Sequence, residues 1–354
     1  DFSVVSGFET LVLAGDMTID LGDLENNTFT LVQTDGAATR AINIDGVVSE
    51  TIKFKDEAIK TGASIDLKDA TGSADSVNIK FTDTASEDFE NLLTIAAVET
   101  INIESDNRNA TISSSVAHTV DLVVAAATTI NVTGDAGLVF GTESGYDISK
   151  VTTLDASGTS IAKATYAGIT YAATFNTAGN ATTIKGSGGV DTIEGGALTD
   201  DTVTLGAGAD VYKYEGGADT VTGGSGADHY DIAAIGTKAK HLVITDLVKD
   251  DEIDLSAITT GTVSGTLGAA VSLSTGTAET LDNYLAAAFG GDGSGTAIVS
   301  HFQVGGNTYL GVNNDNGTTG ASAGYTSGTD ALIEITGLVT LKGATESAEV
   351  YTIV

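Results

Sequence analysis

The sequence predicts an all-β fold, a β-solenoid that contains a parallel β-roll and ends in a β-rich cap with one short helix. Aspartates recur every nine or ten residues between residues 186 and 231, each preceded by glycines and followed by a β-former. Short runs elsewhere alternate polar and apolar residues. The chain of 354 residues has 44 glycines but only 6% aromatic residues. This composition suits β-coils and tight turns better than helices.

Residues 1–180 contain a loose repeat in which Glu-Thr or Thr-Thr precedes alternating apolar residues. Each copy reads as a strand of period two, and a second strand follows it, as at residues 18–21 and 110–113. We therefore expect an irregular solenoid whose rungs are joined by loops of different lengths. The copies lie at residues 8–13, 49–54, 98–103, 128–132 and 151–154.

Residues 181–235 are predicted to form a calcium-binding parallel β-roll. Glycines in the turns let the backbone adopt positive φ and point its carbonyl oxygens inward, where a Cβ would collide. One carboxylate per turn then completes the shell of oxygens that Ca²⁺ prefers. The predicted ligand positions are Asp191, Asp201, Asp210, Asp219, Asp228, Gly186, Gly188, Gly206, Gly208, Gly217, Gly223, Ser225 and Gly226.

Successive turns of a roll lie on opposite edges, so the aspartates should separate into two stacks. The spacing places Asp191, Asp210 and Asp228 on one edge and Asp201 with Asp219 on the other. This arrangement predicts cation sites between 191 and 210, between 210 and 228, and between 201 and 219. The last pair departs most from the repeat because a leucine at position 198 replaces a glycine beside a one-residue insertion. The alternative is a Gly/Ala/Asp loop tract that holds no metal.

A further candidate calcium site lies in the first region. Asp69 and Asp75 flank a turn at Gly72, just before the expected strand at residues 77–81. Carboxylates around a glycine turn are calcium ligands in some loops and solvated turn acids in others. Both interpretations stay open for this pair.

Residues 236–354 are predicted to cap the roll. A strand, an acidic turn and another strand span residues 241–256 and should cover its open end. A helix is expected at about residues 278–289, with Thr277 as its N-cap and Gly290 beyond its end. Its apolar residues recur at helical spacing and should pack on a sheet face. The remaining runs, at residues 302–310 and 331–336, alternate as antiparallel strands do.

Charge and composition narrow the possible partners. The formal net charge of −33 argues against nucleic acid as a partner, since phosphate binding needs a basic face. Divalent cations are natural counter-ions, although an acidic excess also keeps a secreted protein soluble. Cysteine is absent, so bound metal is the obvious candidate to replace disulfides. No apolar run approaches the length of a membrane span. The first residue is Asp1 rather than Met, which suggests a fragment of a longer chain.

No catalytic constellation is apparent, and we expect no enzyme. The four histidines are scattered and none forms an H-E-x-x-H pair. Residues 320–324 match G-x-S-x-G, but no histidine follows Ser322. Nothing selects a carboxylate pair suited to glycoside hydrolysis.

The sequence resembles the C-terminal part of repeats-in-toxin (RTX) proteins exported by type I secretion. The resemblance is carried by the aspartate ladder and by VITDLVKDDEIDLSAI, GGNTYLGVNNDNG and DALIEITGLVTL. More narrowly, it resembles the C-terminal region of the Caulobacter-type surface-layer (S-layer) protein. That similarity is carried by GFETLVLAG, ATGSADSVNIKF, VETINIESD, VTGDAGLVF, GGSGADHYDIAAIGT and AAAFGGDGSGT.

The resemblance implies a structural subunit of a bacterial surface layer. Such a protein is secreted by a type I exporter that reads an uncleaved C-terminal signal, folds on extracellular Ca²⁺, and self-assembles into a two-dimensional lattice on the cell surface. In that family lipopolysaccharide anchoring belongs to an N-terminal region absent from this sequence. The alternatives are a calcium-dependent RTX adhesin or the secretion module of a larger secreted protein. A lattice protein should self-associate with calcium, whereas an adhesin should remain a monomer and bind a foreign surface.

Overall fold

The computed structural model forms two compact units, Asp1–Asp191 and Thr192–Val354, which we describe separately. The boundary lies within strand β16 (Val190–Glu194). The three-part division drawn from the sequence stays a prediction. The structure describes residues 7–24, 29–35, 42–55, 63–86, 88–109, 111, 114–141, 144–172, 180–259, 267, 269–289, 297–314, 325–326, 329–343 and 350–353.

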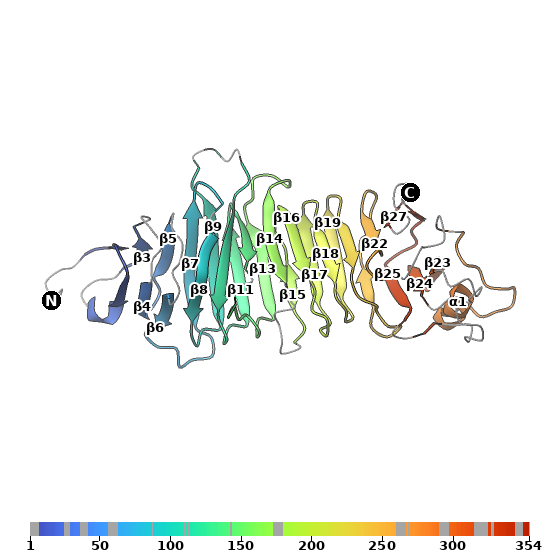
Figure 1. The fold of residues 1–354 in the computed structure, drawn as a ribbon, viewed down its shortest axis with the longest axis horizontal. Helices are drawn as coiled ribbons and strands as arrows, with labels where there is room; N and C mark the ends of the chain where they lie inside the picture. Colours follow the sequence, from blue (N-terminus) through green and yellow to red (C-terminus); the bar gives the residue numbers. More distant parts are fainter. Residues whose placement is uncertain are drawn as a thin grey trace. The chain divides into compact units, whose positions relative to one another are not determined.

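Unit 1 consists of two parallel sheets whose strands alternate along the chain, so each coil adds one strand to each sheet (Figure 1, blue to green). The first sheet has the order β1 (Thr10–Leu13), β3 (Leu31–Thr34), β5 (Thr51–Lys55), β7 (Ser76–Asp83), β9 (Thr100–Asn107), β11 (Thr129–Gly134), β13 (Thr153–Thr159) and β15 (Thr183–Lys185). The second has the order β2 (Met17–Asp20), β4 (Ile42–Val47), β6 (Ala63–Leu67), β8 (Asp88–Ile95), β10 (Ala117–Val123), β12 (Gly137–Phe140) and β14 (Ala167–Ala172). A short 3-10 helix, η1 (Leu21–Leu24), follows β2.

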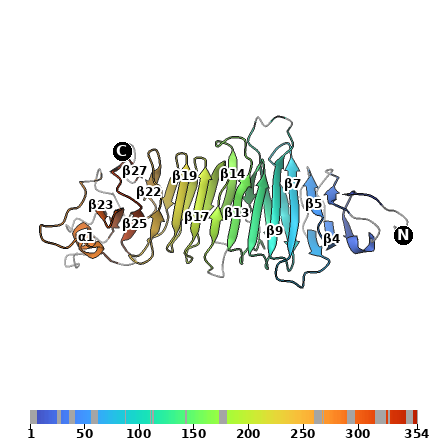
Figure 2. The same cartoon turned by 180° about the vertical axis from the view of Figure 1, so that it is seen from behind.

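The Glu-Thr and Thr-Thr repeat marks the strands of the first sheet. Its five copies become β1, β5, β9, β11 and β13, and the view from behind shows β9 and β13 along the same face (Figure 2). The apolar residue after the threonine points inward, and in-register pairing stacks Ile101, Ile130, Leu154 and Ile184 into one buried row. The predicted solenoid is therefore confirmed for this unit. The strand expected at residues 110–113 lies largely outside the described residues.

Unit 2 begins with parallel strands and then changes to antiparallel ones. One of its sheets runs β17 (Thr202–Ala207), β19 (Thr220–Ser225), β21 (Leu242–Ile244), β25 (Ala331–Ile335), β24 (Asn307–Asn313) and β23 (Ile298–Val304). The other runs from β16 through β18 (Val211–Tyr214), β20 (His229–Ile232), β22 (Glu252–Asp254), β27 (Val350–Ile353) and β26 (Leu341–Gly343). The segment predicted to cap the roll instead extends it, because β21 and β22 pair in parallel with β19 and β20. Antiparallel pairing of β23–β25 and of β26–β27 forms the cap.

The predicted helix exists as α1 (Leu281–Ala288), but it starts later than expected. Thr280, rather than Thr277, is its N-cap, because the Thr280 side chain accepts a hydrogen bond from the backbone N of Asn283. The ring of Tyr284 stacks on Phe302 of β23 with centroids 5.3 Å apart, so the helix packs on a sheet face as predicted. Within the described residues no helix has the length and apolar character needed to cross a membrane.

Candidate functional site

The aspartates of the roll lie on two edges, as their spacing predicts. In unit 2 the strands after Asp201 and Asp219 belong to one sheet, and those after Asp210 and Asp228 belong to the other. Neighbours on an edge are directly linked. The Asp201 backbone N donates to Asp219 Oδ1 at 2.9 Å, and the Asp210 backbone N donates to Asp228 Oδ1 at 3.0 Å. We call the Asp210/Asp228 side the first edge and the Asp201/Asp219 side the second edge.

The predicted carboxylates are buried, which is uncommon for aspartate. None is more than 1% exposed, and the members are Asp191, Asp201, Asp210, Asp219 and Asp228. Burial, opposed by donated hydrogen bonds, raises the pKa of Asp219 to about 7 and that of Asp228 to about 6. Neighbouring carboxylates add to both shifts. The metal-free edges therefore hold negative charge at a cost to stability.

Two further acids join the first edge, and the sequence analysis did not predict either of them as part of it. Asp251 Oδ1 accepts the Asp228 backbone N at 3.0 Å, so it repeats the link between turns. The Asp246 carboxylate accepts the backbone N atoms of Gly223 and Gly224, each at 2.8 Å. A signal for Asp251 was present, because the aspartate followed two residues later by Ile253 has the same pattern as the repeats.

Glycines on both edges adopt the backbone that the repeat requires. Gly217 has φ +88° and Gly226 has φ +146°. A Cβ on Gly217 would lie 1.7 Å from the Thr199 carbonyl oxygen, and one on Gly226 would lie 1.4 Å from that of Gly208. Gly206 also has positive φ. The turns thus stack glycines against carbonyl oxygens, and the part of these oxygens as calcium ligands stays a prediction.

The first-place glycine Gly223 does not have the positive φ that the sequence predicts. A Cβ on Gly223 would lie 2.4 Å from Asp228 Oδ2 and 2.5 Å from the Tyr230 hydroxyl. Its function is to make room for a carboxylate and a ring. Gly188 is unlike the others, since a Cβ there would meet no heavy atom within 4 Å. Gly186 is buried, Gly208 supplies the carbonyl that faces Gly226, and Ser225 is exposed.

Asp191 lies at the end of unit 1 and is held by its own turn and by β14. Its carboxylate accepts hydrogen bonds from the Ser187 backbone N and hydroxyl, both at 2.7 Å, and from the Ile169 backbone N. Gly168 leaves room for it, because a Cβ there would lie 2.1 Å from Asp191 Oδ1. The predicted 191/210 site stays a prediction, because its two acids belong to different units.

The oxygen atoms that could bind a metal at the first edge suit a hard cation. Every candidate group is an oxygen, the ligand type that Ca²⁺ selects. Among the described residues no hydrogen-bond donor reaches Asp228 Oδ2, although this atom is buried. Within those residues no three His, Asp or Glu side chains converge as a metal site. A cation at this edge would therefore draw ligands from backbone carbonyls as well as from carboxylates.

The second predicted site places both acids in one pocket of unit 1. Asp69 and Asp75 line a cavity of about 300 Å³ together with Lys68 and Ser76. Asp69 is exposed, and hydrogen bonds from Thr71 lower its pKa. Asp75 Oδ2 is buried with no hydrogen-bond donor among the described residues, but the remainder of Asp75 is partly exposed. The geometry allows a cation and does not require one.

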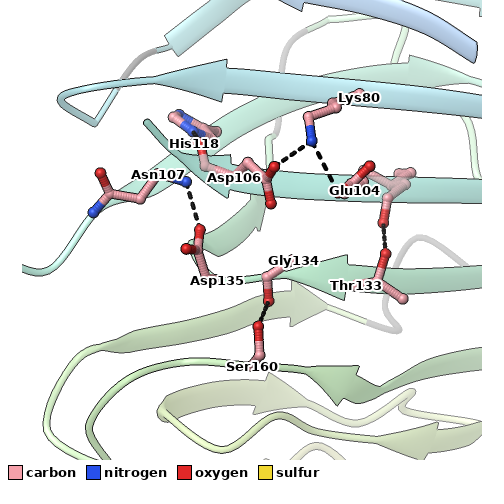
Figure 3. A network of polar contacts seen from close by, with 10 residues as sticks. Lys80, Glu104, Asp106, Asn107, His118, Thr133, Gly134, Asp135 and Ser160 are labelled. Atoms are coloured by element: carbon pink, nitrogen blue, oxygen red, sulfur yellow. Dashed lines mark hydrogen bonds and ion pairs between the residues drawn. The ribbon is translucent and has the colours of Figure 1, made fainter. Parts of the chain in front are cut away.

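In a polar network on unit 1, carboxylates join neighbouring strands by ion pairs. Lys80 of β7 donates to Glu104 at 2.9 Å and also binds Asp106, both on β9 (Figure 3). Partial burial disfavours the charge on Lys80, but these two bonds outweigh it and raise its pKa. His118 Nε2 lies 3.0 Å from the Asp106 carbonyl oxygen, which ties β10 to β9. The network links the neighbouring strands β7 and β9 of one sheet and joins β9 to β10 of the other sheet.

Other motifs and the comparisons add no catalytic assignment. The G-x-S-x-G match at residues 320–324 lies outside the described residues. His241 lies 3.2 Å from Glu334, and His229 lies 3.5 Å from Glu252. Comparison with protein-family models and with curated proteins found no match.

The raised pKa values predict that acid stabilises the metal-free roll. Because Asp219 and Asp228 have folded pKa values above the ordinary 3.8, their stabilising contribution is complete below that value and is lost as pH rises through about 6 to 7. In EGTA, the unfolding temperature followed by circular dichroism should fall between pH ~4.5 and pH ~8. Asp219→Asn should flatten this slope and Asp69→Asn should not. An unfolding temperature that rises across this interval would contradict the assignment.

Proposed function

We propose that this chain is a structural subunit of a bacterial surface layer that folds on extracellular Ca²⁺ and assembles into a lattice. The observation that carries the proposal is the stack of buried carboxylates on the roll edges, with Asp228 Oδ2 left without a donor among the described residues. Bound Ca²⁺ would neutralise these carboxylates and supply the missing partner. Asp210, Asp228 and Asp251, with the carbonyl oxygens of the glycine turns, are the residues that would hold it.

Composition supports metal as the stabiliser of so acidic a chain. The chain contains no cysteine, and its 48 acidic residues outnumber 15 basic ones. A chain that stays unfolded where calcium is scarce could pass through an exporter and fold outside, because the free energy of metal binding becomes folding free energy. This behaviour matches the RTX and S-layer resemblance. The stacked coils support the same role, since solenoids present extended surfaces on which partners bind.

Assembly in the presence of calcium is the expected result that tests this function. Negative-stain electron microscopy and sedimentation velocity should show ordered sheets or oligomers with millimolar Ca²⁺, but not with EGTA or with Mg²⁺ at equal ionic strength. Asp228→Asn should raise the calcium concentration needed for assembly, whereas Asp282→Asn, which changes an exposed acid of α1 outside both candidate sites, provides the acid control. A folded, calcium-bound monomer at every concentration would contradict the lattice and favour an adhesin.

A further inference from the structure

The two edges of the roll satisfy their carboxylates in different ways. On the second edge, Asp219 Oδ1 accepts the Asp201 backbone N, and its Oδ2 accepts the Tyr212 hydroxyl at 2.6 Å. Asp201 Oδ2 accepts the Gly196 backbone N at 2.9 Å and the Thr199 hydroxyl at 2.8 Å. Side-chain hydroxyls therefore reach both carboxylates of this edge.

On the first edge the equivalent hydroxyl finds no carboxylate. Tyr230 pairs in register with Tyr212 on the neighbouring strand, and both rings are fully buried. Yet among the described residues neither the Tyr230 hydroxyl nor Asp228 Oδ2 has a hydrogen-bond partner. One buried carboxylate oxygen on the first edge is thus left for a ligand. On the second edge, both carboxylate oxygens of Asp219 accept hydrogen bonds.

The position of Tyr212 is built into the turn. A Cβ on Gly195 would lie 2.4 Å from the Tyr212 hydroxyl, so only glycine leaves room for it. This turn also departs most from the repeat, because Leu198 replaces a cradle glycine and is 85% exposed. Thr199 follows immediately. The residues that weaken the calcium cradle therefore occur beside those that supply hydroxyl donors.

We propose that Tyr212 and Thr199 close the second edge with hydroxyl groups, so that the calcium requirement of the roll is concentrated on the first edge. This inference rests on the proposed calcium binding. Hydrogen bonds to a charged carboxylate are strong enough to replace part of what a cation supplies. The second edge should therefore order at lower calcium than the first.

Hydrogen exchange of the full chain during a calcium titration separates the two edges. The backbone N–H groups of Gly196 and Asp201 report the second edge, and those of Asp210 and Asp228 report the first. We expect second-edge protection at about tenfold lower calcium, as expected from one hydrogen bond to a charged group. Equal midpoints for the two edges would overturn the inference while leaving calcium binding intact. Protection of both edges in EGTA would overturn the inference and the proposed function together.

Three buried tyrosines provide matched variants that each lose a single oxygen. Tyr212→Phe should raise the second-edge midpoint about tenfold, toward that of the first edge. Tyr230→Phe, which removes a hydroxyl without a partner among the described residues, should leave both midpoints unchanged. The Tyr214 hydroxyl donates to the carbonyl oxygen of Gly217 rather than to a carboxylate. Tyr214→Phe therefore shows the effect of losing a tyrosine hydroxyl that does not bind a carboxylate. Identical shifts in all three variants would show a general packing effect and overturn the role of Tyr212.

A suppressor pair tests the same geometry by another route. Gly195→Ala should displace the Tyr212 hydroxyl and raise the second-edge midpoint. Combining it with Tyr212→Phe should add little further loss, because the hydroxyl oxygen, the atom nearest the added Cβ, is already gone and the next atoms lie at 3.1 Å or more. Additive losses in the double variant would contradict the direct contact.

Discussion

Chelating calcium is expected to unfold the roll and disperse its assemblies, the largest effect that we predict. The buried carboxylates of Asp210, Asp228 and Asp251 lie on one edge, and without a cation their charge must be removed by protonation or by unfolding. Far-UV circular dichroism in EGTA at pH ~8 should lose much of its β signal, and millimolar Ca²⁺ should restore it.

Magnesium at equal ionic strength is the control for this experiment. It screens surface charge as well as calcium does, but its strict octahedral demands fit a carbonyl cradle poorly. If Mg²⁺ restored the far-UV β signal as fully as Ca²⁺, charge screening alone would explain the effect of calcium. A full β signal in EGTA at this pH would contradict the calcium requirement.

Gly226→Ala should abolish the roll or raise its calcium midpoint by at least about tenfold. The added Cβ would lie 1.4 Å from the Gly208 carbonyl oxygen, and the residue has φ +146°, which alanine rarely adopts. Neither the carbonyl nor the backbone can move without breaking the stack of turns. Calcium titration followed by circular dichroism measures the shift.

Gly188→Ala is the matched control, because it is another predicted repeat glycine with nothing within 4 Å of an added Cβ. Its calcium midpoint should stay within about twofold of the parent value. Gly217→Ala should resemble Gly226→Ala, since its Cβ would lie 1.7 Å from the Thr199 carbonyl oxygen. Equal behaviour of Gly188→Ala and Gly226→Ala would contradict the cradle.

The fold could be predicted because its periodicities are local. The nine-residue spacing places Asp201 with Asp219 and Asp210 with Asp228, and the structure shows both links. The threonine-apolar repeat likewise marks strands of one sheet, because a coil returns to the same sheet on each turn. Helical spacing of apolar residues identified α1, but not its first residue, since two threonines compete as N-cap and only Thr280 receives the Asn283 backbone N.

The site was harder to predict, because some of its residues do not follow the nine-residue interval of the repeat. Asp251 comes 23 residues after Asp228, so a search at a nine-residue interval passes over it. Tyr212 occupies the position where the repeat asks only for a β-former, and nothing in the spacing says that its hydroxyl reaches Asp219. Such contacts depend on side-chain reach across the roll rather than on residue type at a given interval.

The most direct test is to locate the ion in crystals of the chain grown with Ca²⁺, from anomalous scattering. We predict an anomalous peak at about 2.3–2.6 Å from a carboxylate oxygen of Asp228 and within reach of Asp210 or Asp251 on the first edge. A well-ordered roll with no anomalous peak beside Asp228 would show that the edge closes without metal and would contradict calcium-driven folding.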